Sequence, residues 1–256
     1  QKNHKISYNH KTFLDKTPLK LPMHFTGSLP SPDYLYVTDS ENLGHMDNHM
    51  DRLHILCLGA PSSTSQNARY ERITVEDDDP CCDVYSLHNE VSMIFQMYQE
   101  WGNALTEIAY GSQDIPKMLR TSEKILENPC ILIDTDFSYM AYSTNFFTAE
   151  KNLILDSADP SSTPLNYVNE FRLDPEFKKL TRKKGVFLYE EHRELGRLLC
   201  YNLTYHNRYF ARLIMHESHH PISEADKKHL AVLARSIQLI FDTRTESLTF
   251  SSRAGN

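Results

Sequence analysis

The sequence has little glycine, no surplus of positive charge and no long run of apolar residues. Its 256 residues include 8 Gly, 12 Pro and 5 Cys, a composition that excludes collagen-like and disulfide-scaffold proteins. Acidic side chains outnumber basic ones by 34 to 27, which gives a net charge of −7, so the chain itself is not expected to bind nucleic acid. No segment approaches the roughly 18 apolar residues of a membrane span, and no basic-then-apolar signal segment is found.

Cysteine is too scarce and too irregularly spaced for a disulfide framework or a metal knuckle. The cysteines are odd in number and contain no C-x-x-C pair. We therefore expect reduced thiols in a cytoplasmic protein, with no metal and no cofactor. The five residues are Cys57, Cys81, Cys82, Cys130 and Cys200.

Residues 1–82 contain short apolar runs that are separated by turns and one helical segment. Three of these runs are typical of strands, namely Tyr34–Val37, His54–Leu58 and Arg72–Val75. Ser40–Arg52 is expected to form a short helix. Strands that alternate with helical or loop segments predict a small layered α/β domain.

Between Val84 and Ile108, apolar residues recur at alternating steps of three and four. This heptad pattern places eight side chains on one stripe of a long helix, and a strict 3.5 repeat favours coiling against a partner helix. We expect residues 83–110 to connect two domains and to mediate a homodimer. The alternative is a core helix within one domain, because Phe95 and Met97 widen the apolar face. The stripe consists of Val84, Leu87, Val91, Ile94, Tyr98, Trp101, Leu105 and Ile108.

Residues 111–245 have the element order of an α+β sensor domain, and residues 246–256 are expected to be a polar tail. A helix is followed by a hairpin, a helical middle segment, three strands and a final helix. Five strands in this order predict an antiparallel sheet with flanking helices. The expected elements are Ile115–Glu127, Cys130–Asp134, Phe137–Tyr142, Asp174–Lys184, Val186–Tyr189, Arg197–Tyr205, Tyr209–His216 and a helix from Ser223 to about Asp242.

Two stretches, Leu105–Gly111 and Asn128–Ser143, carry a resemblance to a known family together with the helix between them. The second stretch, NPCILIDTDFSYMAYS, resembles the hairpin that opens the GAF/PAS-like domain of PucR-type (CdaR-related) bacterial transcriptional regulators. Asp33–Val37 and His54–Gly59 resemble the small N-terminal domain of the same regulators. The resemblance covers roughly residues 30–245. It implies a small α/β domain, a long connecting helix and a GAF/PAS-like five-stranded sensor.

The function that the resemblance implies is the sensory region of a transcription regulator, which binds a small-molecule effector and dimerises. Such regulators bind DNA through a helix-turn-helix domain. No recognition-helix pattern is found in this sequence, so DNA binding is expected to reside outside it. Two alternatives stay open: a scaffold or interaction module without a ligand, and a metal-dependent hydrolase.

The hydrolase alternative depends on residues 216–220, HESHH, which fit the H-E-x-x-H pattern of zinc proteases. That chemistry requires His216 and His220 on one face of a helix, with Glu217 beside them as the base. Here the string follows an apolar strand and runs into a proline, so a strand end or turn is expected. His45 and His49 are a second possible metal pair, although two surface histidines on a polar helix are the usual outcome.

An effector in a sheet of this kind would lie between the sheet and the helical middle segment, in a pocket that is mostly apolar with a few polar groups. Tyrosine suits such a wall because it offers apolar area and one hydrogen-bonding tip, but aromatic residues on strands more often belong to the core. The residues expected to face the effector are Tyr142, Tyr167, Asn169, Tyr201 and Arg212.

Overall fold

A computed structural model describes residues 5–8, 19–25, 31, 33–43, 53–60, 71–76, 82–146, 162–190 and 196–253. The chain divides into two compact units, Gln1–Gln99 and Glu100–Asn256. Each unit has its own sheet and its own hydrophobic clusters. The boundary between the units falls within one long helix.

The first unit contains a five-stranded sheet with the strand order β1-β5-β4-β3-β2. Strands β2 to β5 pair in parallel, and β1 is antiparallel to β5. The three strands predicted from the sequence are confirmed as β3, β4 and β5, whereas β1 and β2 were not predicted. The elements are β1 Lys5–Tyr8, β2 Pro22–His24, β3 Leu35–Asp39, α1 Ser40–Leu43, β4 His54–Leu58 and β5 Glu71–Glu76. The rest of the helix expected up to Arg52, with His45 and His49, lies outside the described residues.

Strands β3 and β4 are buried on both faces, as is usual for parallel strands that consist of near-continuous apolar runs. Val37 packs with Leu56 in one cluster, while Tyr36 packs with Ile55 and Cys57 in another. A sheet whose strands are buried on both faces must be covered by other parts of the chain on both sides, as in a layered α/β domain. The small α/β domain expected from the sequence is therefore confirmed in its architecture.

Helix α2, Val84–Tyr110, has 27 residues and is about 40 Å long at 1.5 Å per residue. The predicted stripe is helical throughout, but its side chains have three different environments. The N-terminal members pack in a cluster of the first unit, the C-terminal members lie in the main core of the second unit, and Ile94 and Tyr98 between them are 49% and 38% exposed. The first group is Val84, Leu87 and Val91, and the last is Trp101, Leu105 and Ile108.

This distribution corrects part of the predicted dimer interface. Leu87, Trp101, Leu105 and Ile108 are at most 7% exposed, and a side chain enclosed in its own core cannot contact a partner helix. Trp101 is further fixed by a 3.0 Å hydrogen bond from its Nε1 to Oγ of Ser122. These side chains are core residues, Leu87 in the first unit and the other three in the second, so a core helix within one domain does not describe the stripe either.

The second unit contains a five-stranded antiparallel sheet with the order β7-β6-β10-β9-β8. The predicted sheet with flanking helices is confirmed, and the fold class is α+β. The elements are α3 Ile115–Leu126, β6 Cys130–Asp134, β7 Tyr139–Tyr142, η2 Thr144–Phe146, α4 Leu165–Leu173, α5 Pro175–Leu180, β8 Val186–Tyr189, β9 Leu198–Tyr205, β10 Arg208–His216 and α6 Glu224–Arg253.

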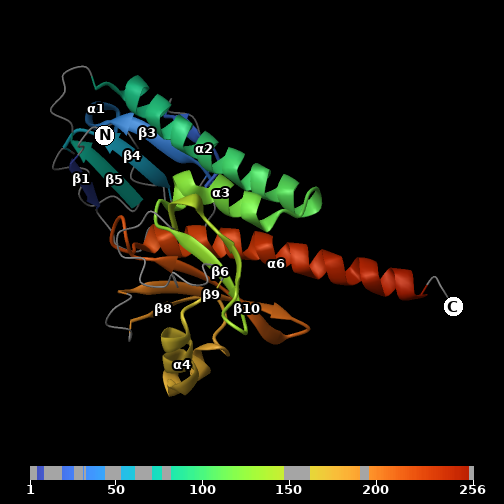
Figure 1. Cartoon of the computed structure of the whole chain (residues 1–256). Coiled ribbons are helices and arrows are strands. Elements are labelled where there is room, and N and C mark those ends of the chain that lie inside the picture. The colour runs from blue at the N-terminus through green and yellow to red at the C-terminus, as the bar shows by residue number, and fades with distance from the viewer. Residues whose placement is uncertain are drawn as a thin grey trace. The chain divides into compact units, whose positions relative to one another are not determined.

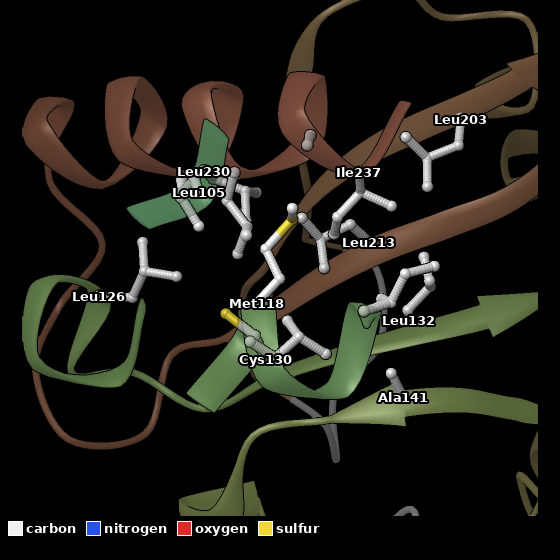
Figure 2. Close-up of a cluster of buried hydrophobic side chains, with 14 of the residues drawn as sticks. Leu105, Met118, Leu126, Cys130, Leu132, Ala141, Leu203, Leu213, Leu230 and Ile237 are labelled. Atoms are coloured by element: carbon white, nitrogen blue, oxygen red, sulfur yellow. The ribbon is translucent and has the colours of Figure 1, made fainter. Parts of the chain in front are cut away.

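The two faces of this sheet pack against different helices. On one face, Leu132 and Leu213 of the sheet meet Met118 of α3 and Leu230 and Ile237 of α6 in an apolar core (Figure 2). On the other face, side chains from α4, α5 and η2 form a second cluster that is rich in aromatic rings. Figure 1 shows α6 and α4 on opposite sides of the sheet. Because successive side chains of a strand alternate between faces, each strand contributes to both clusters.

The helical middle segment differs from the single helix that was predicted over Asp174–Lys184. It consists of α4 and α5, which meet at Asp174. The Asp174 carboxylate accepts a hydrogen bond from the main-chain N of Glu176, and Pro175 occupies the first helical position. Both features favour the start of a new helix, so α5 begins here.

The last helix is longer than predicted. Helix α6 continues to Arg253, so the expected helix end near Asp242 is wrong, and most of the segment 246–256 that was expected to be a polar tail is helical. No proline or glycine occurs between Ser223 and Gly255, so nothing in the sequence stops the helix earlier.

Candidate functional site

Three polar side chains are buried on the sheet face that packs against α4 and α5. Arg212, Asn202 and His216 are at most 6% exposed there, although the residues around them are apolar or aromatic. Burial of a polar group costs free energy unless the group is paired. These side chains therefore define the candidate site.

Arg212 lies in the middle of β10 and is fully buried, with 0% of its side chain exposed. Its Nε donates a 2.9 Å hydrogen bond to Oδ1 of Asn202, which lies directly opposite on β9. Its Nη1 and Nη2 atoms are buried and have no hydrogen-bond partner among the described residues. A guanidinium has five N–H donors and a permanent positive charge, so most of its binding capacity is unused.

Three aromatic rings surround the Arg212 guanidinium. Its Cζ lies 4.3 Å from the ring centroid of Phe177, 5.4 Å from that of Tyr209 and 5.5 Å from that of Phe187. A β-bulge between Tyr209 and Ala211 shifts the alternation of β10, which brings Tyr209 to the Arg212 side. Cation–π attraction offsets part of the cost of burying this charge, but it does not satisfy the N–H donors.

Asn202 connects Arg212 to the C-terminal end of α5. Its Nδ2 donates hydrogen bonds to the main-chain oxygen atoms of Leu180, at 2.6 Å, and Lys183, at 3.0 Å. Leu180 is the last residue of α5, and its oxygen also accepts a 3.1 Å hydrogen bond from the main-chain N of Lys183, so the amide joins the turn that closes the helix. The same amide therefore fixes both the guanidinium and the end of the helix.

The N-terminal end of α5 is fixed by a second hydrogen bond. The Tyr189 hydroxyl donates to Oδ2 of Asp174 at 2.9 Å. Between these two attachments, Phe177 of α5 places its ring over Arg212 and packs against Phe171, with 4.8 Å between the ring centroids. A molecule that reaches Nη1 and Nη2 must therefore displace the Phe177 ring or lie beside it.

A hollow of about 320 Å³ lies beside α5, at the edge of the sheet. Two of its wall residues, Leu180 and Tyr189, also belong to the aromatic cluster. Glu176 and Glu190 at this hollow form ion pairs with Lys179 and with Arg197, the latter at 3.2 Å. Its walls are formed by Glu176, Leu180, Lys183, Leu188, Tyr189 and Glu190.

Two ionisable side chains on the same face are held in their neutral forms. Burial lowers the pKa of His216 to about 4, and its Nε2 is buried without a hydrogen-bond partner among the described residues. Burial also raises the pKa of the Cys200 thiol to about 11, although Arg212 acts in the opposite direction. At physiological pH a thiol of this kind is protonated and is a poor nucleophile.

The five side chains expected to face an effector do not all meet. Arg212 and Tyr167 are buried on the α4–α5 side, and Tyr142 lies at its edge, 40% exposed, with its ring 6.3 Å from that of Phe146. Tyr201 packs against the core on the opposite face, and Asn169 is exposed on α4. The structure thus corrects the placement of Tyr201 and Asn169.

Asn202 and Phe177 belong to the site but were not predicted as site residues, and His216 was named only in the hydrolase alternative. Asn202 is a polar residue in the apolar strand β9, two positions from Cys200 on the same face. A single amide within such a strand is the signal that could have identified it, because an unpaired amide is costly there.

The H-E-x-x-H string does not form a helix. Strand β10 ends at His216, and α6 begins only at Glu224. The Glu217 carboxylate accepts a 3.1 Å hydrogen bond from Nη1 of Arg197 and a 2.8 Å hydrogen bond from the main-chain N of Ile222. Oε1 of Glu217 therefore accepts both hydrogen bonds within the turn. His216 and His220 do not share the helix face that zinc-protease chemistry requires.

The same turn is organised around the Asn128 side chain. Its Oδ1 accepts hydrogen bonds from the main-chain N–H groups of Ser218, His219 and His220, at 3.1, 2.9 and 3.3 Å. The sequence expectation of a turn at this place is confirmed. Across the part of the chain that the structure describes, no group of three or more His, Cys, Asp or Glu side chains could hold a metal ion.

An open groove of about 720 Å³ lies in the first unit. It includes the exposed stripe residues Ile94 and Tyr98 of α2, and it is mostly apolar. Its one cation, Lys20, forms an ion pair with Asp33 at 2.9 Å. The groove is formed by Leu19, Lys20, Leu21, Tyr34, Ile94, Phe95, Tyr98 and Gln99.

Within the described ranges, no helix is long and apolar enough to cross a membrane.

Comparison with known proteins gives similarity only at the level of solved structures. No family model matches the sequence, and no curated protein matches it. A GAF domain of a sensor histidine kinase from Pseudomonas syringae pv. tomato is 12% identical, with a TM-score of 0.38, and the match covers 67% of this chain and 99% of that one. The phycocyanobilin-bound GAF domain of a cyanobacterial phytochrome is 11% identical, with a TM-score of 0.40 and coverage of 58% and 96%.

A third similar structure is the GAF domain of an Acinetobacter phosphoenolpyruvate-protein phosphotransferase. It is 13% identical, with a TM-score of 0.35, and the match covers 59% of this chain and 95% of that one. At this level of similarity the three structures do not identify site residues in this chain.

Proposed function

We propose that this chain is the sensory region of a cytoplasmic bacterial transcription regulator of the PucR type, and that its second unit binds a small-molecule effector. The observation that carries the proposal is Arg212, a fully buried cation whose Nη1 and Nη2 have no hydrogen-bond partner among the described residues. Burying a charge whose donors are only partly paired costs free energy, on the order of a few kcal/mol, which is a large part of the stability margin of a domain. A binding role explains why a cation stands where an apolar side chain would pack at less cost.

Binding, and not conversion, is the role proposed for this site. The Cys200 thiol on the same sheet face has a pKa raised to about 11 by burial, so it is not activated as a nucleophile. His216 is neutral and lies against the ring of Phe146, with 5.6 Å between the ring centroids. These groups suit recognition of a ligand better than they suit a covalent step.

The path of the signal follows from the alternation of side chains in β10. Arg212 faces α5, while its neighbour Leu213 lies in the core that α3, α6 and the end of α2 share. A ligand that changes the position of β10 relative to this core changes the packing of both long helices. Such a ligand needs only a higher affinity for one helix arrangement than for the other. In this proposal, a helix-turn-helix domain outside these residues binds the DNA.

The exposed middle of α2 supports a homodimer as part of the proposal. Four apolar side chains on two adjacent turns of α2 are exposed: Met93 at 70%, Ile94 at 49%, Met97 at 42% and Tyr98 at 38%. Apolar residues grouped in this way mark a contact surface more often than scattered ones do. The dimer contact is therefore assigned to the middle of the predicted stripe and not to its ends.

A thermal-shift screen of the full chain tests the ligand-binding role. Amino acids, monocarboxylates, nucleobases, nucleotides and sugars would each be added at millimolar concentration. A ligand at 100 times its Kd adds about 2.7 kcal/mol of stability, which for a domain of this size is a rise of several degrees in Tm. If no class raises Tm, the alternative of a scaffold module without a ligand is favoured. One tightly held zinc ion per purified chain would instead favour a metal-dependent role.

A further inference from the structure

On the basis of the proposed function, we infer that the ligand is a monocarboxylate with an apolar body, and that its carboxylate binds Nη1 and Nη2 of Arg212. Nε is already engaged by Oδ1 of Asn202 at 2.9 Å, so the terminal edge of the guanidinium is the part left for a ligand. This edge presents two parallel N–H groups, the geometry that a carboxylate accepts in a bidentate manner.

The charge of the site determines the charge of the ligand. Arg212 is a single positive charge in a fully buried position, and one carboxylate neutralises it. The other cations near the aromatic cluster are exposed: Nζ of Lys183 lies 5.6 Å from the ring centroid of Phe187, and Cζ of Arg172 lies 6.0 Å from that of Phe137. A phosphate dianion would therefore leave one negative charge buried and unpaired, which is costly.

The surroundings of Arg212 determine the body of the ligand. The guanidinium is enclosed by Phe177, Tyr209 and Phe187, and the wider cluster is made of aromatic and aliphatic side chains. Asn202, the polar neighbour of Arg212, is already occupied by the carbonyl groups at the end of α5. His216 Nε2 is the other buried atom on this face that lacks a hydrogen-bond partner among the described residues, and one such atom cannot replace the hydration of several hydroxyl or amino groups. An aromatic ring or alkyl chain would instead be stabilised by contact.

Entry of this ligand requires movement of Phe177. Its ring is 4.3 Å from Cζ of Arg212, closer than the other two rings. Helix α5, which carries Phe177, has only six residues and is attached by side-chain hydrogen bonds at its two ends. Displacement of this short helix couples ligand binding to the Asn202 amide and hence to β9 and β10.

The test uses phenylacetate and hexanoate as probes, with phenylacetamide and hexanamide as neutral analogues of the same shape. Calorimetric titration and thermal shift would be measured for the full chain and for Arg212→Met, Arg212→Lys and Arg208→Met. Arg208 is an exposed arginine at the start of the same strand and serves as the matched control. Inorganic phosphate and acetate complete the set as anions without an apolar body.

We expect at least one of the two carboxylates to bind, and its amide analogue to bind at least about 30-fold more weakly, as the loss of a charge-assisted bidentate contact predicts. Arg212→Met and Arg212→Lys should weaken the carboxylate by a similar factor, and Arg208→Met should leave it unchanged. Equal binding of acid and amide, or equal binding to the Arg212 variants, would overturn the inference. Binding of phosphate alone, or of another class of compound in the screen, would overturn the ligand class but keep the sensory role. No binding by any class in the screen would overturn both.

Discussion

The Asn202 side chain accepts a hydrogen bond from Nε of Arg212 at 2.9 Å, between opposite positions of β9 and β10. Its amide nitrogen points the other way, to the carbonyl groups of Leu180 and Lys183 at the end of α5. An amide has one acceptor end and one donor end, and both are used here, so its orientation is fixed by its partners. The buried cation and the cover helix are thus connected through one side chain.

Asn202→Ala is expected to reduce the free energy of unfolding by about 1–3 kcal/mol, because it leaves Nε of Arg212 and the carbonyl group of Leu180 buried without this partner. Chemical denaturation of the full chain would measure the change. Asn169→Ala is the matched control, since Asn169 is an exposed asparagine on α4 and its replacement should change stability by less than about 0.5 kcal/mol. Equal effects of the two variants would show that the Asn202 contacts contribute nothing specific.

Arg212→Met is expected to be tolerated in the absence of ligand. Replacing a buried charge by an apolar side chain of similar size is often neutral or stabilising, because the desolvation cost disappears. The variant loses one hydrogen bond to Asn202 and the contacts with Phe177, so we expect a net loss of no more than about 1 kcal/mol. Denaturation midpoints measured without ligand decide the matter. A loss of about 3 kcal/mol or more would mean that the guanidinium is a structural element and would contradict a binding role.

His216 makes the stability of the second unit depend on pH. Its pKa is lowered by burial from 6.5 to about 4, so the unfolded chain takes up a proton between these values while the folded chain does not. Stability is therefore lost as the pH falls through this window, by about 3 kcal/mol in total, and the loss is complete below pH 4. His216→Leu should flatten the profile.

The control for this profile is His219→Leu, because His219 is exposed in the following turn. Burial also lowers the pKa of His229, so some dependence in the same direction should remain in His216→Leu. Denaturant midpoints between pH 7 and pH 4 would be compared for the three proteins. An unchanged slope in His216→Leu would show that this histidine is protonated in the folded state.

The parts of this structure that were predictable are those whose pattern is local. The 3-4 spacing over residues 84–108 identified α2, and the short apolar run Val186–Tyr189 predicted β8 with its observed bounds. The face that a strand residue takes could not be predicted, because both faces of this sheet are covered and both are apolar. The sequence therefore does not distinguish Tyr201 from Arg212, although Tyr201 packs on the opposite face of the sheet.

The site itself depends on features that no local pattern reveals. Tyr209 reaches the Arg212 side only because of the bulge in β10, and Phe177 does so only because Asp174 starts a new helix. Pairing of Asn202 with Arg212 depends on the register between β9 and β10. Arg212 was predicted as a ligand residue because it lies on a strand of the sheet. Its neighbours Asn202, Phe177 and Tyr209 could be identified only from the three-dimensional structure.

The middle of α2 provides a prediction that separates the dimer surface from the core. Ile94→Glu with Tyr98→Glu places two charges on exposed positions of the helix, so we expect the variant to fold with nearly unchanged stability but to be monomeric. Leu105→Ala removes a fully buried side chain from the second unit and should cost about 2–5 kcal/mol while leaving the association of the folded chain intact. Light scattering should give a mass near twice 29.7 kDa for the parent chain and for Leu105→Ala below its unfolding temperature. A parent chain that stays monomeric at high concentration would contradict the dimer, and a dimer that survives both glutamate substitutions would place the contact elsewhere on the molecule.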